Sequence, residues 1–181
     1  ALLPMLSVRL ATDGTDRASR ARTEAKQEIG PRLRSHLEVV KIIRDTLPST
    51  IIVGDSAQPT YAANLYYDHD RPSGWFNSAT GFGALGYAAP ASVGAQLGAP
   101  GSTVVCLTGD GGLQFSLAEL GSAKDIDAPV IFVVWNNNGY QEIETSMVDA
   151  GIKPVGVTPQ APDFGLIAKS YGIDFARPTS L

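Results

Sequence analysis

Residues 103–114 read TVVCLTGDGGLQ, and this segment decides the fold that the sequence predicts. Its apolar run leads to a single acid, Asp110, with one glycine before it and two after it. A short continuous apolar run bounded by turn residues is typical of a strand that is buried on both faces. We therefore expect a buried strand that ends with a carboxylate among glycines.

Further apolar runs alternate with helical patterns on both sides of this segment. TIIVGD at 50–55 and PVIFVVWNN at 129–137 predict two more strands, and DFARP at 174–178 predicts a short last one. Helical spacing of apolar residues predicts a helix at 35–48, and further helices are expected at 84–99, which is rich in small residues, and at 116–126, 140–148 and 163–172. Strands of this kind, alternating with helices, imply a parallel sheet with helices on both faces. The predicted fold class is α/β, a doubly wound parallel sheet.

Several of these helices carry boundary signals. The spacing of a capping box, which marks the start of a helix, occurs twice, and two prolines indicate where a helix ends, bends or begins. The residues are Ser35 with Glu38, Ser116 with Glu119, Pro48 as the end of the first helix, and Pro90 as a kink or a new start in the second.

The composition places the chain among globular proteins, because 44% of its 181 residues are hydrophobic and 18% are charged. A net charge of -4 gives no electrostatic footprint for nucleic acid. No apolar stretch approaches the roughly 18 residues of a membrane span, and the start, ALLPMLSVRL, lacks the basic residues of a signal peptide. The single cysteine, Cys106, excludes an intrachain disulfide and favours the cytoplasm. We expect neither a nucleic-acid nor a membrane partner.

The chain divides into a linker and one domain. Residues 11–34 carry many charges of both signs without a sustained helical or strand period, which indicates an exposed linker. We therefore assign 1–34 to an interdomain linker with an N-terminal remnant, and 35–181 to the α/β domain. Since there is no initiator Met, we expect the chain to begin within a longer protein.

Oxygen-bearing side chains follow two successive strands. Asp110 ends one strand, and Asn136, Asn137 and Asn138 end the next. Adjacent parallel strands would bring these ends together, and ligands of such folds bind beyond the carboxyl ends of the strands. Carboxylate and amide oxygens suit Mg²⁺ or Ca²⁺, and glycines let backbone N–H groups approach a phosphate. The alternative is a sharp turn in which Asp110 caps the following helix.

These residues carry a resemblance to a known family. Gly109, Asp110 and Gly111, followed by an apolar strand that closes on Asn136 and Asn137, resemble the cofactor motif of thiamine diphosphate-dependent enzymes. The stretches GFGALGYAAPASVGAQLG and LAELGSAKDIDAPVIFVVWNNNGY are similar to the acetolactate synthase and benzoylformate decarboxylase branch, over about residues 50–150. The chain is identified as a member of this family, namely its diphosphate-binding domain.

The resemblance implies a role for each site residue. Asp110 and Asn137 would supply side-chain oxygens to Mg²⁺, and Gly139 a main-chain carbonyl. Thiamine diphosphate would contact Gly109, Gly111 and Gly112 through its diphosphate, where many relatives have serine at 112. The remaining cofactor contacts would be Ser56 and Gln58 with the diphosphate, Gly83 through its carbonyl with the 4′-amino group, and Leu85 between the two rings. GFGALG at 81–86 also has the spacing of a dinucleotide fingerprint, but SGWFNSAT, not an apolar strand, precedes it.

The resemblance also indicates what this chain lacks. Family members activate the cofactor with a glutamate from another subunit's pyrimidine-binding domain, and nothing here matches it. His36 and His69 are expected at the surface, not in catalysis. We therefore expect no catalytic residue in this chain, an inactive isolated fragment, and a homodimer or homotetramer in the full-length enzyme.

A signal for the substrate follows residues 136–139, the segment that contains two of the expected metal ligands. Glu142 and Ile143 fall at pocket-lining positions of the family, and a carboxylate there suits a guanidinium. This favours a decarboxylase acting on an arginine-derived 2-oxo acid, 5-guanidino-2-oxopentanoate. The other reading of Glu142 is a solvated helix acid. Alternatives for the whole are an acetolactate synthase-like carboligase, a non-catalytic phosphate-binding module, and a dimerisation domain built on the small residues of 84–99.

Overall fold

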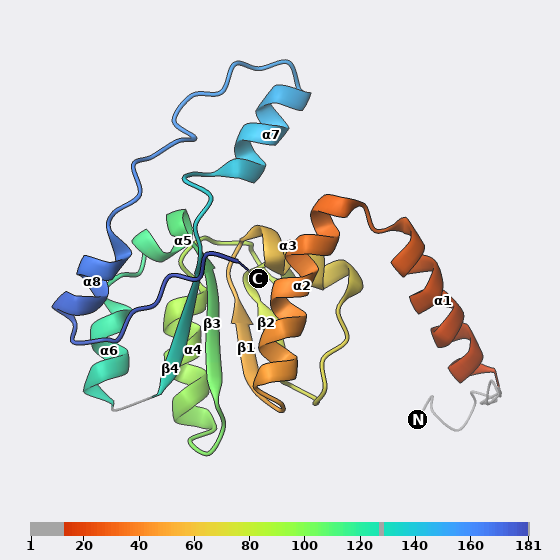
Figure 1. Ribbon diagram of the computed structural model, residues 1–181, viewed down its shortest axis with the longest axis horizontal. Coiled ribbons are helices and arrows are strands. Elements are labelled where there is room, and N and C mark those ends of the chain that lie inside the picture. The colour runs from red at the N-terminus through yellow and green to blue at the C-terminus, as the bar shows by residue number, and fades with distance from the viewer. Residues whose placement is uncertain (1–12, 127–128, 181) are drawn as a thin grey trace, which may run out of the picture.

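A parallel sheet forms the centre of the molecule. The computed structural model describes residues 13–126 and 129–180 (Figure 1). Within them, four strands form one sheet in the order β2-β1-β3-β4, and all neighbouring strands are parallel. The strands are β1 Ile51–Gly54, β2 Trp75–Asn77, β3 Val104–Gly109 and β4 Val130–Trp135. The doubly wound α/β fold is confirmed.

Both faces of the sheet are covered, as continuous apolar strands require. The residues of β1 and β3 belong alternately to two hydrophobic cores, one on each face of the sheet, because successive side chains of a strand point to opposite faces. Ile52 and Leu107 pack on the side of α2 Pro31–Thr46 and α3 Gln58–Tyr66. On the other side lie α4 Ala88–Gly98 and α8 Phe164–Ser170, and α6 Glu119–Asp125 packs beside α4.

The capping boxes predicted the helix starts incorrectly. The helix α2 begins at Pro31, four residues before the predicted start, because Pro at a first helical position is pre-organised for the helix. Ser35 therefore lies inside α2, where its Oγ donates to the Arg32 carbonyl at 2.8 Å. Likewise α6 begins only at Glu119, with no side-chain cap. Pro90 lies in the first turn of α4, so it marks a new start and not a kink.

The charged segment 14–28 is helical, contrary to the irregular linker that was predicted. Its helix, α1 Gly14–Glu28, has no buried residue and extends away from the sheet (Figure 1). Ala, Arg, Lys, Glu and Gln are strong helix formers, so α1 forms without an apolar stripe. Its exposure agrees with the prediction, and residues 1–12 lie outside the described residues.

The predicted last strand is absent. Residues 174–178 have no regular secondary structure. Phe175 instead lies against Gly165 of α8, so closely that a Cβ added to this glycine would be 3.2 Å from two atoms of the Phe175 ring. The Arg177 guanidinium lies over the same ring, 5.9 Å from its centroid. The one large apolar side chain of this segment therefore covers a helix and does not extend the sheet.

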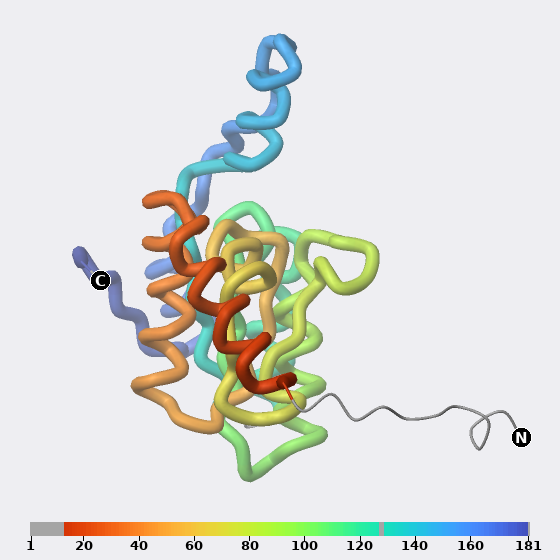
Figure 2. Tube along the Cα trace, turned by 90° about the vertical axis from the view of Figure 1, so that its right-hand side faces the viewer, coloured from red at the N-terminus to blue at the C-terminus, as the bar shows by residue number. Residues whose placement is uncertain are grey.

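The chain beyond β4 rises past the carboxyl ends of the strands. The helix α7 Gln141–Asp149 projects beyond the sheet, and residues 151–162 return without helix or strand to α8, as predicted (Figures 1 and 2). Below α7, β3 passes directly into a short helix, α5 Asp110–Gln114, that was not predicted. A one-turn 3₁₀ helix, η2 Ser78–Thr80, follows β2.

Candidate functional site

A cavity of about 290 Å³ lies beyond the carboxyl ends of β1, β3 and β4. The chain runs from β1 to β2 on one side and then to β3 on the other, so this edge is the switch point where α/β folds bind ligands. All the site residues predicted from the sequence line this one cavity: Ser56, Gln58, Gly83, Leu85, Gly109, Asp110, Gly111, Gly112, Asn137, Gly139, Glu142 and Ile143. Their individual roles stay predictions.

Three oxygen-bearing groups converge in the cavity. The β3–β4 register pairs Gly109 with Trp135, so Asp110 and Asn137 both emerge just beyond the last pair. The Asn137 amide atom that faces Asp110 lies 3.1 Å from Asp110 Oδ1 and 2.8 Å from the Gly139 carbonyl oxygen. Asp110 is buried, and its Oδ2 has no hydrogen-bond partner among the described residues. A buried carboxylate with an unpaired oxygen calls for a positive partner.

These groups fit a small divalent cation. Ligand oxygens about 2.0–2.1 Å from Mg²⁺ in an octahedron lie roughly 2.9 Å from one another, whereas Ca²⁺ distances of about 2.3–2.6 Å in the same geometry would spread them to roughly 3.3–3.7 Å. The two separations from the Asn137 amide atom, 2.8 and 3.1 Å, lie near the spacing of oxygens around Mg²⁺, and they are also the lengths of hydrogen bonds that the amide N–H₂ group would donate if the amide were turned. No group of three or more His, Cys, Asp or Glu side chains among residues 13–126 and 129–180 offers another metal centre.

Gln58 lies at the centre of a hydrogen-bond network beside these oxygens. Its Oε1 accepts from Trp135 Nε1–H and from Asn137 Nδ2, each at 3.1 Å. Its Nε2 donates to Glu142 Oε1 at 2.9 Å. All its side-chain groups thus have protein partners, while its predicted diphosphate contact stays a prediction.

Three glycines that line the cavity, Gly111, Gly112 and Gly139, leave space that a neighbouring group occupies. A Cβ on Gly111 would overlap with the Tyr140 ring, and one on Gly139 would overlap with the Val157 carbonyl oxygen. Gly139 also has a φ of 151°, which side-chain-bearing residues rarely adopt. A Cβ on Gly112 would lie 3.2 Å from the Asp55 carboxylate.

Asp55 fixes the loop that carries Gly83 and Leu85. This fully buried carboxylate accepts from the backbone N–H groups of Ser56, Gly86 and Ala88, at 2.8, 3.2 and 3.0 Å. Ala88 is the first residue of α4, so its N–H has no partner within the helix. Asp55 therefore caps the start of α4 and holds the preceding loop in place.

The Gly83 carbonyl already has one donor. Ser56 Oγ lies 2.9 Å from it, and also 2.9 Å from Ser78 Oγ. Because a carbonyl oxygen has two lone pairs, Gly83 can accept a second hydrogen bond from a ligand. Gly83 has a φ of 76°, which its glycine permits.

Glu142 joins the cavity to the helix α2. In addition to Gln58, its Oε1 receives the Arg32 guanidinium at 3.4 Å. Glu142 thus contacts two polar groups, while its neighbour Ile143 is 49% exposed at the cavity edge. A carboxylate here already accepts a guanidinium.

The surface position predicted for the two histidines is wrong. His36 is buried, and its ring packs edge-on against Trp135 with centroids 5.3 Å apart. Burial lowers the pKa of His36, as does the nearby Arg32 charge, while Glu142 opposes both. The His69 side chain is 7% exposed and bonds to Tyr67 and to the Thr50 carbonyl, at the opposite end of β1. Neither ring lines the candidate site.

The sequence missed several residues of this cavity, among them Trp135, Tyr61 and Tyr140. A signal for Trp135 does exist. It stands two residues before Asn137 at the end of a strand, and residues two apart in a strand share a face.

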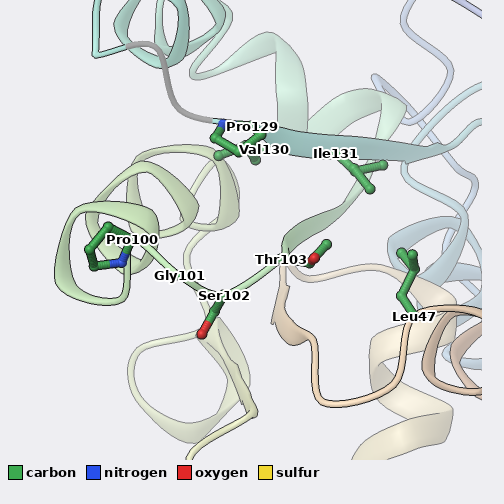
Figure 3. Close-up of a pocket in the computed structure, with 8 residues that line it drawn as sticks. All are labelled: Leu47, Pro100, Gly101, Ser102, Thr103, Pro129, Val130 and Ile131. Carbon is green, nitrogen blue, oxygen red and sulfur yellow. The ribbon is translucent and has the colours of Figure 1, made fainter.

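A larger hollow, of about 530 Å³, opens at the other end of the strands (Figure 3). It is lined by Leu47, Pro100, Gly101, Ser102, Thr103, Pro129, Val130 and Ile131. None of these side chains titrates, and parallel sheets bind ligands at the opposite end. The smaller cavity is therefore the candidate site. In the part of the chain that the structure describes, no helix has the length and apolar character needed to cross a membrane.

Comparisons with known proteins agree with this geometry. The family described as "Thiamine pyrophosphate enzyme, C-terminal TPP binding domain" matches residues 53–180. The chain is 35% identical to a probable 2-ketoarginine decarboxylase of Pseudomonas aeruginosa, over 99% of this chain and 33% of that protein. It is 34% identical to the acetolactate synthase isozyme 3 large subunit of Escherichia coli, over 76% of this chain and 25% of that protein.

A solved structure is similar too. The thiamine diphosphate-dependent 4-hydroxybenzoylformate decarboxylase of Rhodococcus jostii superposes with a TM-score of 0.66 at 28% identity, over 76% of this chain and 26% of that one. The chain thus spans a third or less of the length of these relatives.

Proposed function

Because the chain belongs to the thiamine pyrophosphate enzyme family, whose C-terminal TPP binding domain it matches, we propose that it forms the diphosphate- and Mg²⁺-binding half of a 2-oxo acid decarboxylase active site. One observation carries the proposal. The Asp110 carboxylate and the Gly139 carbonyl lie 3.1 and 2.8 Å from the same Asn137 amide atom, and the buried Asp110 Oδ2 has no hydrogen-bond partner among the described residues, which is an arrangement that a shared Mg²⁺ would complete.

Each part of the cavity has a task in this proposal. Asp110, Asn137 and Gly139 hold the cation, while Gly111 and Gly112 offer backbone N–H groups to the diphosphate. The Gly83 carbonyl accepts a hydrogen bond from the aminopyrimidine, and the Leu85 side chain supports the bent cofactor, with Ser56 and Gly109 beside it. When bound, the cofactor supplies an electron sink for the pair left behind when a 2-oxo acid loses CO₂.

We further propose that the substrate carries a guanidinium, as 5-guanidino-2-oxopentanoate does. The support is Glu142, a carboxylate at the cavity wall that receives the Arg32 guanidinium at 3.4 Å. A substrate guanidinium would compete with Arg32 for this acceptor, and Ile143 would contact its methylene chain. The name of the Pseudomonas relative refers to the same compound, also called 2-ketoarginine.

Other segments would complete the enzyme. The relatives are about three to four times as long as the part that this chain matches, which leaves room for a pyrimidine-binding domain with the activating glutamate. We propose that residues 1–34 connect the domain at 35–181 to such a domain, that subunits associate as a homodimer or homotetramer, and that the enzyme acts in the cytoplasm.

Binding and product analysis test these proposals separately. Calorimetry should show thiamine diphosphate binding that needs Mg²⁺ and that is lost in Asp110→Ala, with no comparable binding of ADP. Equal binding with and without Mg²⁺, or a preference for ADP, would refute the cofactor site and favour a phosphate-binding module.

The reaction is tested with the complete gene product that carries this chain. It should release CO₂ from 5-guanidino-2-oxopentanoate faster than from pyruvate, and Glu142→Leu should reverse this preference. Formation of acetolactate from pyruvate alone would instead identify a carboligase, the activity named in the Escherichia coli relative.

A further inference from the structure

We propose that Gln58 is a positioning residue that, held by Trp135 and Glu142, turns the Asn137 oxygen toward Asp110 and Gly139. The proposal rests on the cation site proposed above and deepens it. It assigns three residues that do not contact the cation to the task of orienting one of its ligands.

The first step is the hydrogen bond from Trp135. An indole N–H donates only, so the Gln58 atom 3.1 Å from it must be the amide oxygen. The second partner acts on the opposite side of the same amide. An ionised carboxylate can accept hydrogen bonds but cannot donate them, and Glu142 Oε1 lies 2.9 Å from Gln58 Nε2, so that the Gln58 atom facing it must be the amide nitrogen. Turning the Gln58 amide would break both contacts at once, so its orientation is fixed from two sides.

The orientation of Gln58 then decides that of Asn137. Gln58 Oε1 lies 3.1 Å from the Asn137 amide, which must therefore present its NH₂ group there. The Asn137 oxygen is left facing Asp110 Oδ1 at 3.1 Å and the Gly139 carbonyl oxygen at 2.8 Å. With the Asn137 amide turned, its nitrogen would donate to these two oxygens, but its oxygen would face Gln58 Oε1.

The hydrogen bonds of Gln58 thus influence which of two states the site adopts, and these states differ in the orientation of the Asn137 amide. In one, three oxygens face a common point and need a cation. In the other, the Asn137 NH₂ group fills that point and closes the site. Gln58 is buried, so water does not readily replace its hydrogen bonds. Gln58 and Trp135 therefore oppose the closed state, in which the turned Asn137 amide would make two hydrogen bonds of its own, and they support the open state that a cation needs, as outer-shell partners do in metal sites.

Mn²⁺ binding, followed by electron paramagnetic resonance in the presence of thiamine diphosphate, tests this role without relying on catalysis. Gln58→Met keeps the side-chain length but removes the acceptor and the donor, and Trp135→Phe removes the N–H. Each should weaken Mn²⁺ binding by about 10- to 100-fold, the usual effect of losing such a partner. Because both act through one amide, the double variant should be no weaker than Gln58→Met alone.

Two matched controls separate this effect from general damage to the fold. Gln96→Met removes a buried amide whose Nε2 contacts the Pro100 carbonyl, away from the cavity. Trp75→Phe alters the other tryptophan of the chain, on β2. Both should leave Mn²⁺ affinity within twofold of the unaltered protein.

A rescue variant supplies the sharpest test. A carboxylate at position 137 presents an oxygen whichever way it is turned, so Asn137→Asp should make Gln58→Met harmless to Mn²⁺ binding. Unchanged affinity in both Gln58→Met and Trp135→Phe would overturn the positioning role while the cation site stands, as would a failure of the rescue. If the unaltered protein binds no Mn²⁺, the proposed cation site falls, and the positioning role with it.

Discussion

Replacing Asp55 with Asn tests how the loop before α4 is held. The carboxylate is fully buried and accepts three backbone N–H groups, two through Oδ1 and one, from Ala88, through Oδ2. An asparagine has one oxygen, so at least one of these donors loses its acceptor and faces an NH₂ group.

The expected cost follows from these contacts. Losing one buried hydrogen bond to a charged acceptor costs about 1.5–3 kcal/mol. The remaining bonds weaken as their acceptor becomes neutral, which brings the expected loss of unfolding free energy for Asp55→Asn to roughly 2–4 kcal/mol. In a chain of this length that corresponds to a decrease in Tm of about 5–15 °C.

Urea denaturation followed by circular dichroism measures the change, and the chain offers a matched control. Asp163 accepts from two backbone N–H groups at the start of α8, at 2.9 and 3.1 Å, but it is exposed. Asn caps helices as well as Asp does, so Asp163→Asn should cost less than about 0.5 kcal/mol. If Asp55→Asn costs no more than this control, Asp55 does not hold the loop as argued.

Three further predictions concern the site and the core. Gly111→Ala should weaken binding of thiamine diphosphate, measured by calorimetry, because its Cβ would overlap with the Tyr140 ring; Gly98→Ala, on the helix α4 with open space around its Cβ, should instead stabilise the fold by about 0.5–1 kcal/mol. The pKa of His36 lies below its unfolded value of 6.5, so the unfolded chain takes up this proton first as the pH falls. The stability that the neutral His36 ring contributes is complete above pH 6.5 and is lost as the pH falls below it. Urea titrations should therefore show a smaller change in the free energy of unfolding between pH 7.5 and pH 5.5 for His36→Phe than for the unaltered protein, and an equal change would contradict a buried neutral ring. Burial raises the pKa of the Cys106 thiol to about 12, so a thiol reagent at pH 8 should label the protein only after unfolding; rapid labelling of the folded protein would contradict a closed core.

Local sequence patterns were sufficient to predict that the two halves of the proposed cation site lie together. The apolar runs predicted β3 and β4, and the parallel arrangement then predicted that Asp110 and Asn137 meet. The observed register, with Gly109 opposite Trp135, confirms that the strand ends lie together. These features could be predicted because each depends on neighbours in sequence and on the parallel order of the strands.

Contacts between distant residues were beyond such patterns. His36, on α2, is buried with its ring against Trp135 of the strand β4, and no spacing within the helix indicates this contact. The partners of Gln58 are 77, 79 and 84 residues away along the chain. The fifteen-residue α1 was missed for a different reason, since its helix propensity is not accompanied by an apolar stripe.

The passage from β3 to α5 contains no connecting residue, since Gly109 ends the strand and Asp110 begins the helix. Adding or removing one residue here would rotate the carboxylate away from Asn137, because the strand register fixes one side of the junction and the buried Leu113 fixes the other. We therefore expect homologous chains to vary in length across residues 151–162, and we expect an insertion or deletion at 109–110 only in a relative that lacks the proposed cation ligand.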